Sequence, residues 1–298
     1  MALLAGCAAP RVTSLVENRP AALPARIELD GVPFHPQDAY QCGPASLATV
    51  MQFAGKTVSP EALVAQVYLP ARKGALQPEM LAATRRQGLV AYELAPTLEA
   101  LLRQVAAGTP VVVLQNLGLD WVPQWHYAVV IGYDLDARNV VLRSGATRRL
   151  VMSLDAFERT WARSGHWAML ALSPERLPVA ADERRTVTAL AALERASPAA
   201  ARQGYRAALG RWPDSEAAGL GFGNASYALG DLDGAAAAYA RVTARHPGAA
   251  DAWNNLAQTL FELGRREAAR SAAQRAVALG GARVDQYRAT LRAIELGR

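Results

Sequence analysis

The spacing of apolar residues predicts mixed secondary structure in the first part of the chain. Apolar positions three or four residues apart predict helices over residues 43–51, 60–67, 78–87, 97–106 and 155–161. Short apolar runs bounded by turn residues predict strands at residues 110–114, 126–133, 139–142, 150–152 and 167–172. Residues 134–138 join two of these strands as a hairpin turn. A helix-rich half followed by an antiparallel sheet indicates an α+β domain.

Beyond Pro178 the strand pattern stops and alanine-rich helical spacing replaces it. Pro213 and Pro247 lie 34 residues apart, and a frame of that length gives repeats at 182–215, 216–249 and 250–283. Small residues recur at matching positions of this frame, namely Ala189, Gly223 and Ala257 in the first helices and Ala201, Ala235 and Ala269 in the second. This register resembles tetratricopeptide (TPR) repeats, which implies an all-α solenoid.

An unrelated alanine-rich helical bundle is the alternative for this second part. The 34-residue register argues against it, because Tyr205 and Tyr239 also repeat, and Gly230 and Gly264 both mark the turn between helices. A last helix is predicted over residues 284–296, where it would cap the open end of the solenoid.

Length and composition agree with two folded domains. The chain has 298 residues, of which 51% are hydrophobic and 19% charged, values that exclude wholesale disorder. No run of about 18 apolar residues is present, so the sequence predicts no membrane-spanning helix. We expect an N-terminal signal and tether over residues 1–25, the α+β domain over 26–178 and the helical repeats over 179–298.

The net charge of +6 is a weak argument for a nucleic-acid partner. The arginines are scattered among acidic residues, without a basic run, an aromatic stacking motif or zinc-ligand spacing. We therefore expect no nucleic acid. Because the sequence contains neither a phosphate-binding loop motif nor a metal-ligand cluster, it also predicts no ATP, cofactor or metal.

Residues Leu4-Ala5-Gly6-Cys7 resemble the lipobox of bacterial lipoproteins. That resemblance implies cleavage before Cys7, acylation of Cys7 and a location in the bacterial envelope, with the membrane reached by the lipid anchor alone. Only six residues precede Cys7, too few for a signal peptide, so we expect the natural start to lie upstream. The alternative is an ordinary alanine-rich terminus.

Cys42 begins a predicted helix in the segment Gln41-Cys42-Gly43-Pro44. Most free cysteines are small buried thiols without chemistry. A helix N-terminus, however, lowers the pKa of a thiol and favours the nucleophilic thiolate. Gly43 would leave the approach to the sulfur open for a substrate carbonyl. The sequence therefore makes Cys42 a candidate nucleophile.

His126 is the best candidate for the base that such a nucleophile needs. It opens a predicted strand after a loop that contains Trp121 and Trp125, which we expect to form a wall of the cleft. A core or capping histidine is the alternative reading. Of the other histidines, His35 lies close to Cys42 in sequence, His166 fits the sheet near Trp167, and His246 fits a helix C-terminus.

From about Val32 to Leu172 the sequence resembles the papain-like peptidases of cysteine family 39, the type that processes bacteriocin leaders. The shared residues, in order, are Gln37, Cys42-Gly43, the strand-forming run 108–113, His126-Tyr127 and Gly132-Tyr133-Asp134. The resemblance implies a papain-like fold, a Cys42 nucleophile and a His126 base. It also implies that Gln37 donates its side-chain amide to the oxyanion, together with the backbone N–H of Cys42.

One residue of the family pattern is missing. The family orients the histidine with an aspartate on the next strand, where this chain has Arg143-Ser144. Asn139 lies early in that strand, and the hydroxyl of Ser144 would orient the histidine only weakly. The third catalytic position is therefore unassigned from the sequence.

The leading hypothesis is a cysteine peptidase that hydrolyses peptide bonds with Cys42, His126 and Gln37, and whose TPR repeats dock a substrate or protein partner. The alternative is a catalytically weak or inactive papain-like lipoprotein that acts as a protein-binding envelope scaffold. The same thiol chemistry also serves acyl transfer to an amine, which the sequence leaves open.

Overall fold

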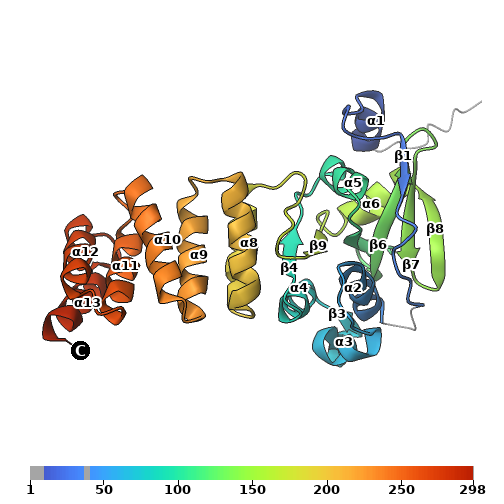
Figure 1. Cartoon of the computed structure of the whole chain (residues 1–298). Coiled ribbons are helices and arrows are strands. Elements are labelled where there is room, and N and C mark those ends of the chain that lie inside the picture. The colour runs from blue at the N-terminus through green and yellow to red at the C-terminus, as the bar shows by residue number, and fades with distance from the viewer. Residues whose placement is uncertain (1–9, 37–40, 298) are drawn as a thin grey trace, which may run out of the picture. The chain divides into compact units, whose positions relative to one another are not determined.

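The computed structural model describes residues 10–36 and 41–297, and the contacts divide the chain into two compact units (Figure 1). The first unit extends to Ser173 and includes Pro178–Ala181, and the second contains Pro174–Leu177 and the residues from Asp182 onward. Within the described residues, no helix is long and apolar enough to cross a bilayer. The boundaries of the three expected segments stay a prediction.

A seven-stranded antiparallel sheet forms the centre of the first unit. Its strands follow the order β4-β9-β5-β6-β7-β8, and β1 pairs with the far part of β6. The strands are β1 (Arg26–Glu28), β4 (Val90–Glu93), β5 (Val111–Asn116), β6 (Trp125–Asp134), β7 (Asn139–Ser144), β8 (Thr147–Ser153) and β9 (Ala168–Leu172). The long strand β6 is buried along most of its length because β5, β7 and β1 flank it.

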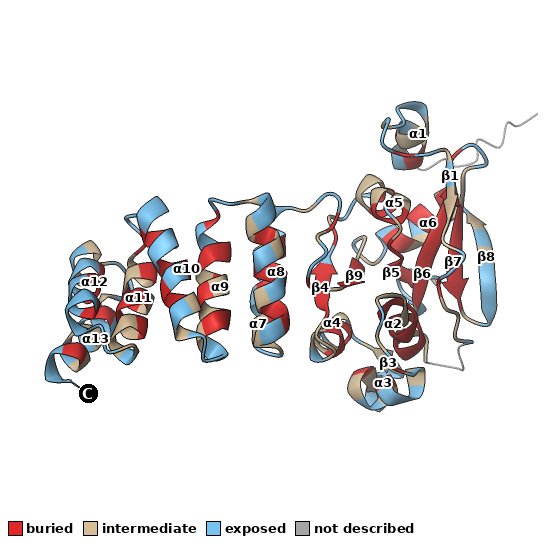
Figure 2. Cartoon of the chain, in the orientation of Figure 1, coloured by how far each residue is buried: buried red, intermediate tan, exposed pale blue. Residues whose placement is uncertain are grey.

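Six helices and a small ribbon surround this sheet. The helices are α1 (Pro10–Glu17), α2 (Cys42–Phe53), α3 (Pro60–Val67), α4 (Gln77–Arg86), α5 (Leu98–Ala106) and α6 (Leu154–Ala162). The ribbon consists of β2 (Tyr68–Leu69), the 3-10 turn η1 (Pro70–Arg72) and β3 (Gly74–Ala75). Figure 2 shows that α2 is buried almost throughout, whereas β8 is largely exposed.

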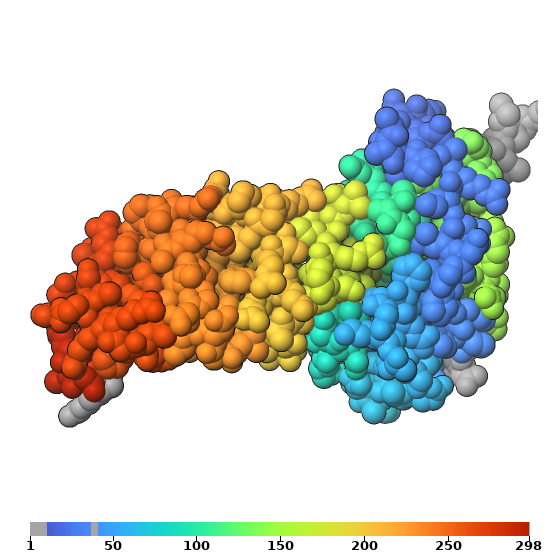
Figure 3. All heavy atoms as spheres, viewed as in Figure 1, coloured from blue at the N-terminus to red at the C-terminus, as the bar shows by residue number. Residues whose placement is uncertain are grey.

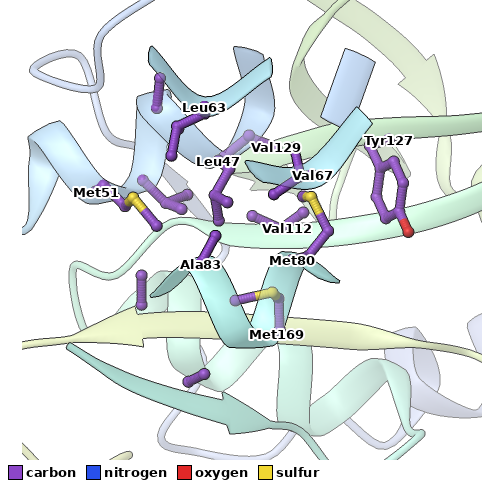
Figure 4. Close-up of a cluster of buried hydrophobic side chains, with 14 of the residues drawn as sticks. Leu47, Met51, Leu63, Val67, Met80, Ala83, Val112, Tyr127, Val129 and Met169 are labelled. Carbon is purple, nitrogen blue, oxygen red and sulfur yellow. The ribbon is translucent and has the colours of Figure 1, made fainter. Parts of the chain in front are cut away.

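The core of the first unit fixes α2 against the sheet. Leu47 and Met51 of α2 are fully buried and belong to one cluster with Met80 of α4 and Val129 of β6 (Figure 4). A helix that is apolar on all sides is stable only when it is covered on all sides. The first turn of α2, with Cys42, is thereby held at a fixed place beside β6.

The helices and strands that the sequence predicts in this unit are confirmed, with shifts of up to three residues at their ends. Four strands were not predicted, β1, β2, β3 and β4, because each is shorter than the windows in which alternation is visible. The segment expected as a tether contains α1, and the side chain of Val12 in this helix is fully buried.

The second unit consists of seven helices in the described range 182–297. They are α7 (Glu183–Glu194), α8 (Pro198–Arg211), α9 (Glu216–Ala228), α10 (Leu232–Arg245), α11 (Ala250–Glu262), α12 (Arg266–Leu279) and α13 (Val284–Leu296). Each predicted repeat holds one helix pair, and α13 follows as the predicted last helix. In the space-filling view the orange and red helices stack in sequence order (Figure 3). The α+β domain followed by TPR-like helices is confirmed.

Small residues of the repeats lie where neighbouring helices approach closely. A Cβ added at Gly223 of α9 would collide with the ring of Tyr239 in α10, whereas one added at Gly210 of α8 would meet no atom within 4 Å. We expect Gly223→Ala to lower the free energy of unfolding by about 1–2 kcal/mol, because overpacking outweighs the gain in helix propensity.

Urea unfolding followed by far-ultraviolet circular dichroism measures this effect. Gly210→Ala is the matched control, and we expect it to leave stability unchanged or to raise it by less than about 1 kcal/mol. Equal destabilisation by both substitutions would contradict the packing argument.

Candidate active site

Cys42 lies in the first turn of α2, as the sequence predicts. Its side chain is partly buried and packs against the main core cluster of the first unit. Gln41 precedes the helix without a side-chain cap, so no side chain of that residue occupies the first backbone N–H groups. The sulfur therefore lies at an uncapped helix N-terminus.

The sulfur of Cys42 faces β6 at the residue next to His126. Backbone hydrogen bonds from Tyr127, Gly43 and Cys42 itself favour the thiolate form of the side chain. Gly43 makes this approach possible, because a Cβ there would come 2.5 Å from Cβ of Ala75. Gly43 thus lets α2 pack tightly against the β2–β3 ribbon. Its predicted role in leaving the sulfur open to a substrate carbonyl stays a prediction.

His126 is the second residue of β6 and is held by one side-chain contact. Its Nε2 lies 2.8 Å from the Oγ of Ser144, the last residue of β7. The contact arises because β6 and β7 pair in antiparallel register, with Val129 opposite Arg143. Ser144 therefore occupies the orienting position that the sequence left unassigned, and Asn139 lies at the opposite end of β7.

Arg143, beside Ser144, has a structural role. Its buried guanidinium donates to the carbonyl oxygen of Val32 at 2.9 Å through Nη2 and to that of Arg148 at 2.6 Å through Nη1. These bonds fasten the segment before Cys42 to β7 and β8. Arg143, which stands where the family has an aspartate, thus stabilises the backbone around the site and does not orient the imidazole of His126.

Cys42 and His126 line one cavity of about 930 Å³. The β2–β3 ribbon contributes Arg72 to Ala75 to its wall, and the loop between β5 and β6 contributes Leu117 and Pro123 to Trp125. The cavity is large enough for several residues of a peptide. The structure thus brings together two of the predicted catalytic residues, which lie far apart in the sequence.

Burial shifts both groups toward their neutral forms. It raises the pKa of the Cys42 thiol, against the smaller opposing effect of the backbone N–H groups, and it lowers the pKa of the His126 imidazole. The sequence-based expectation of a lowered thiol pKa is therefore wrong. The helix N-terminus does favour the thiolate, but desolvation of the partly buried sulfur is the larger effect.

These shifts predict how alkylation of Cys42 depends on pH. Because the raised pKa keeps the thiol neutral, we expect its reaction with iodoacetamide to rise with pH and to reach half-maximum above the ordinary value of 9.0. The measurement uses Cys7→Ser protein, in which Cys42 is the only thiol. A plateau reached below pH 8.5 would instead indicate a thiolate–imidazolium pair.

Other predicted residues lie elsewhere. Gln37 and Cys7 fall outside the described residues, so their roles stay predictions. His35 contacts Gln52 Oε1 at 3.1 Å, and His166 contacts the buried Glu158 at 2.9 Å from a turn between α6 and β9. His246 ends α10, as expected. Among the described residues, no three His, Cys, Asp or Glu side chains gather in a way that would hold a metal.

Comparison with known proteins agrees with both parts of the fold. Residues 29–169 match the family model described as Peptidase_C39 like family, and residues 220–284 match a tetratricopeptide repeat model. The N-terminal half thus contains a sheet-containing C39-like domain, and the run of helices that follows is consistent with a TPR region.

Two solved structures resemble the first of these parts. A putative C39-like peptidase from Bacillus anthracis is 23% identical, with a TM-score of 0.42 over 48% of this chain and 96% of its own. A double glycine motif protease from an AMS/PCAT transporter, in complex with the leader peptide, is 22% identical, with a TM-score of 0.36 over 48% of this chain and 91% of its own. No curated protein matches.

Proposed function

We propose that the C39-like domain is a cysteine peptidase that hydrolyses peptide bonds. The observation that carries the proposal is the placement of Cys42 at the start of α2, where its sulfur meets the backbone of Tyr127, the neighbour of His126, at the wall of one cavity. A nucleophile and a base that share a cavity are the minimum set for acyl chemistry.

In this proposal the imidazole accepts the thiol proton as the sulfur attacks. We assign to His126 the tautomer in which Nε2–H donates to Ser144 Oγ, which lies 2.8 Å away, so that Nδ1 carries the lone pair. The Cys42 sulfur bonds to the substrate carbonyl carbon while its proton moves to Nδ1. When the C–N bond breaks, that proton passes to the leaving amine. Water then attacks the thioester and gives a proton to Nδ1. When the C–S bond breaks, that proton returns to the sulfur, and the acid and the free thiol are released.

Charge on the attacked oxygen needs hydrogen-bond donors. The uncapped backbone N–H of Cys42 is one of them, and we assign the side-chain amide of Gln37 as the second, from the family resemblance. Each such donor contributes about 10² to 10³ in rate. Because burial favours the neutral thiol, donors that act only on the developing charge are the main source of rate in this site.

Degradation of a peptide mixture tests the proposal. The Cys7→Ser protein is incubated with peptides from a bacterial proteome, and new termini are identified by mass spectrometry. The control is the same protein with Cys42→Ser, which keeps the volume of the side chain. We expect termini that require Cys42. Identical peptide profiles for the two proteins would overturn the proposal.

A protein-binding scaffold is the second candidate function. Two features favour it: the side chain that contacts His126 is a serine hydroxyl and not a carboxylate, and burial raises the pKa of Cys42. Both slow thiol chemistry. A scaffold would bind its partner equally well with Cys42→Ser and would cleave nothing. TPR repeats provide such a surface for a protein partner.

We also propose that Cys7 is lipidated and that the protein faces the periplasm of a bacterial envelope. The support is the lipobox-like run that ends at Cys7. Expression from the natural gene with an alkyne-bearing fatty acid tests this. We expect label on the wild-type protein and none on Cys7→Ser, and label on both would contradict the assignment.

A further inference from the structure

Large apolar side chains gather on the surface at the rim of the candidate active site. Ten large apolar residues are exposed in the described part of the chain. Six of them lie in two short segments beside the cavity: Leu76, Leu117, Leu119, Trp121, Val122 and Trp125. Residue Trp121 is 78% exposed and Trp125 is 52% exposed. Clusters of this kind on a soluble surface mark binding sites. We call residues 117–125 the aromatic loop.

The aromatic loop is held in one shape by its own hydrogen bonds. Leu119 and Val122 exchange two backbone bonds of 3.1 Å, and the Leu117 N–H donates to Gln124 O at 2.9 Å. The buried Asn116 accepts from the N–H groups of Gly118 and Gln124, at 3.0 and 2.8 Å. A loop that exposes indoles in a fixed arrangement presents them for contact without a large ordering cost.

Arg163 of the segment after α6 braces the same loop from below. Its Nη1 donates to the carbonyl oxygens of Asn116 and Gly118, at 3.2 and 2.6 Å. The carboxylate of Asp120 lies 3.8 Å from its Nε. Arg163 therefore has partners within the protein, and the loop needs no ligand to hold its shape.

The ribbon that lines the cavity carries positive charge. Arg72 is an exposed residue of this wall, and no aspartate or glutamate is found among the described residues that line the cavity. The aromatic loop contains one acid, Asp120, which lies 3.8 Å from Arg163. A bound group with a carboxylate would therefore meet complementary charge at the ribbon.

We infer that the site selects peptides that combine a large apolar side chain with a carboxylate, the apolar group lying on the aromatic loop and the carboxylate at Arg72. This inference rests on the proposed peptidase function and adds a substrate class to it. The carboxylate belongs either to an acidic side chain or to the C-terminus of the peptide, because both present the same group to the ribbon.

A peptide accounts for these features better than a lipid surface does. Leu117 and Trp125 belong both to the exposed cluster and to the lining of the cavity that contains Cys42. The apolar surface thus continues into the cavity, where an extended chain fits but a bilayer does not. A substrate that runs from the loop into the cavity would bring a peptide bond to the sulfur.

Binding of four labelled peptides tests the inference. Fluorescein-labelled dodecamers carry leucine or serine at one central position, and glutamate or glutamine at the acidic positions. Anisotropy is measured on Cys42→Ser protein, so that no turnover occurs. We expect the leucine–glutamate peptide to bind at least about tenfold more tightly than each of the other three.

Variants assign each preference to its surface. We expect Trp121→Ser to remove the preference for leucine and Arg72→Ala to remove the preference for glutamate. The matched controls are Val151→Ser and Arg148→Ala, exposed positions of β8 away from the cavity. Peptides with an amidated C-terminus show which carboxylate is bound: a preference kept after amidation belongs to the side chain, and one lost belongs to the terminus.

Three outcomes would overturn the inference: equal affinity for all four peptides, equal effects of site and control variants, or Trp121-dependent binding to phosphatidylglycerol vesicles without peptide selectivity. Different results would contradict the proposed peptidase function. If these preferences appear but no peptide is ever cleaved, the binding site stands and the peptidase proposal falls. If cleavage occurs without the preference, the peptidase stands and the substrate class falls.

Discussion

Replacement of His126 by alanine is expected to lower kcat for peptide hydrolysis by about 10² to 10⁴, the usual contribution of a positioned general acid–base group. The variant keeps Cys42 and the cavity, so substrate binding and KM should change little. The loss falls on kcat because the thiol, whose pKa burial raises, has no other acceptor for its proton in the proposed mechanism. Steady-state kinetics on a cleaved peptide measures both constants.

The double variant makes this expectation sharper. Cys42→Ser and His126→Ala act on one proton transfer, so their combined loss should fall well short of the product of the separate losses. His35→Ala is the control, because His35 contacts Gln52 and is absent from the cavity lining. A His126→Ala enzyme with wild-type kcat would remove the imidazole from the mechanism.

The elements of the fold follow from local patterns to different degrees. The helix at Pro60–Val67 was predictable to the residue, because Ser59 caps it and Pro60 begins it. The repeat helices were predictable because every pair returns in a 34-residue frame. Strand β4 was not, since four residues give too little alternation and it pairs with β9, which lies far along the chain.

The sequence predicted which residues form the candidate site, but it did not predict how deeply they are buried or how burial shifts their pKa values. Cys42 and His126 are marked by their place at the start of a helix and a strand. The direction of the Cys42 pKa shift was missed, because burial of the sulfur depends on distant segments, such as Tyr127 beside the sulfur and Ala75 beside Gly43. The aromatic loop was expected as a wall of the cleft, but only its exposed fraction distinguishes such a wall from core.

The contact of His126 with Ser144 also depends on tertiary structure that the sequence does not reveal. A serine on β7 gave no reason to prefer it over Asn139, and the distance of 2.8 Å follows from the strand register. Irregularities in that register occur at Val130/Gly132 and at Leu142/Ser144, and no sequence pattern fixes them. The orienting residue therefore emerges from tertiary structure.

Replacement of Ser144 by alanine is expected to lower kcat about tenfold to hundredfold at unchanged KM. The Nε2–H of His126 would lose its acceptor, so the imidazole would spend less time in the tautomer that leaves Nδ1 free. The loss is smaller than for a charged orienting group, because a hydroxyl stabilises the imidazolium only weakly. The measurement is kcat against pH for wild type and variant.

Ser144→Asp should act in the opposite direction and distinguishes orientation from simple packing. A carboxylate beside the imidazole favours its charged form, so the pKa of His126, which burial lowers, should rise. Above that pKa the base is neutral, and the acidic limb of the kcat profile should therefore move to higher pH. At the plateau the aspartate would stabilise the imidazolium formed during attack and raise kcat above that of Ser144→Ala. If all three proteins share one profile, Ser144 does not position His126, and the family's missing aspartate has no functional substitute at this place.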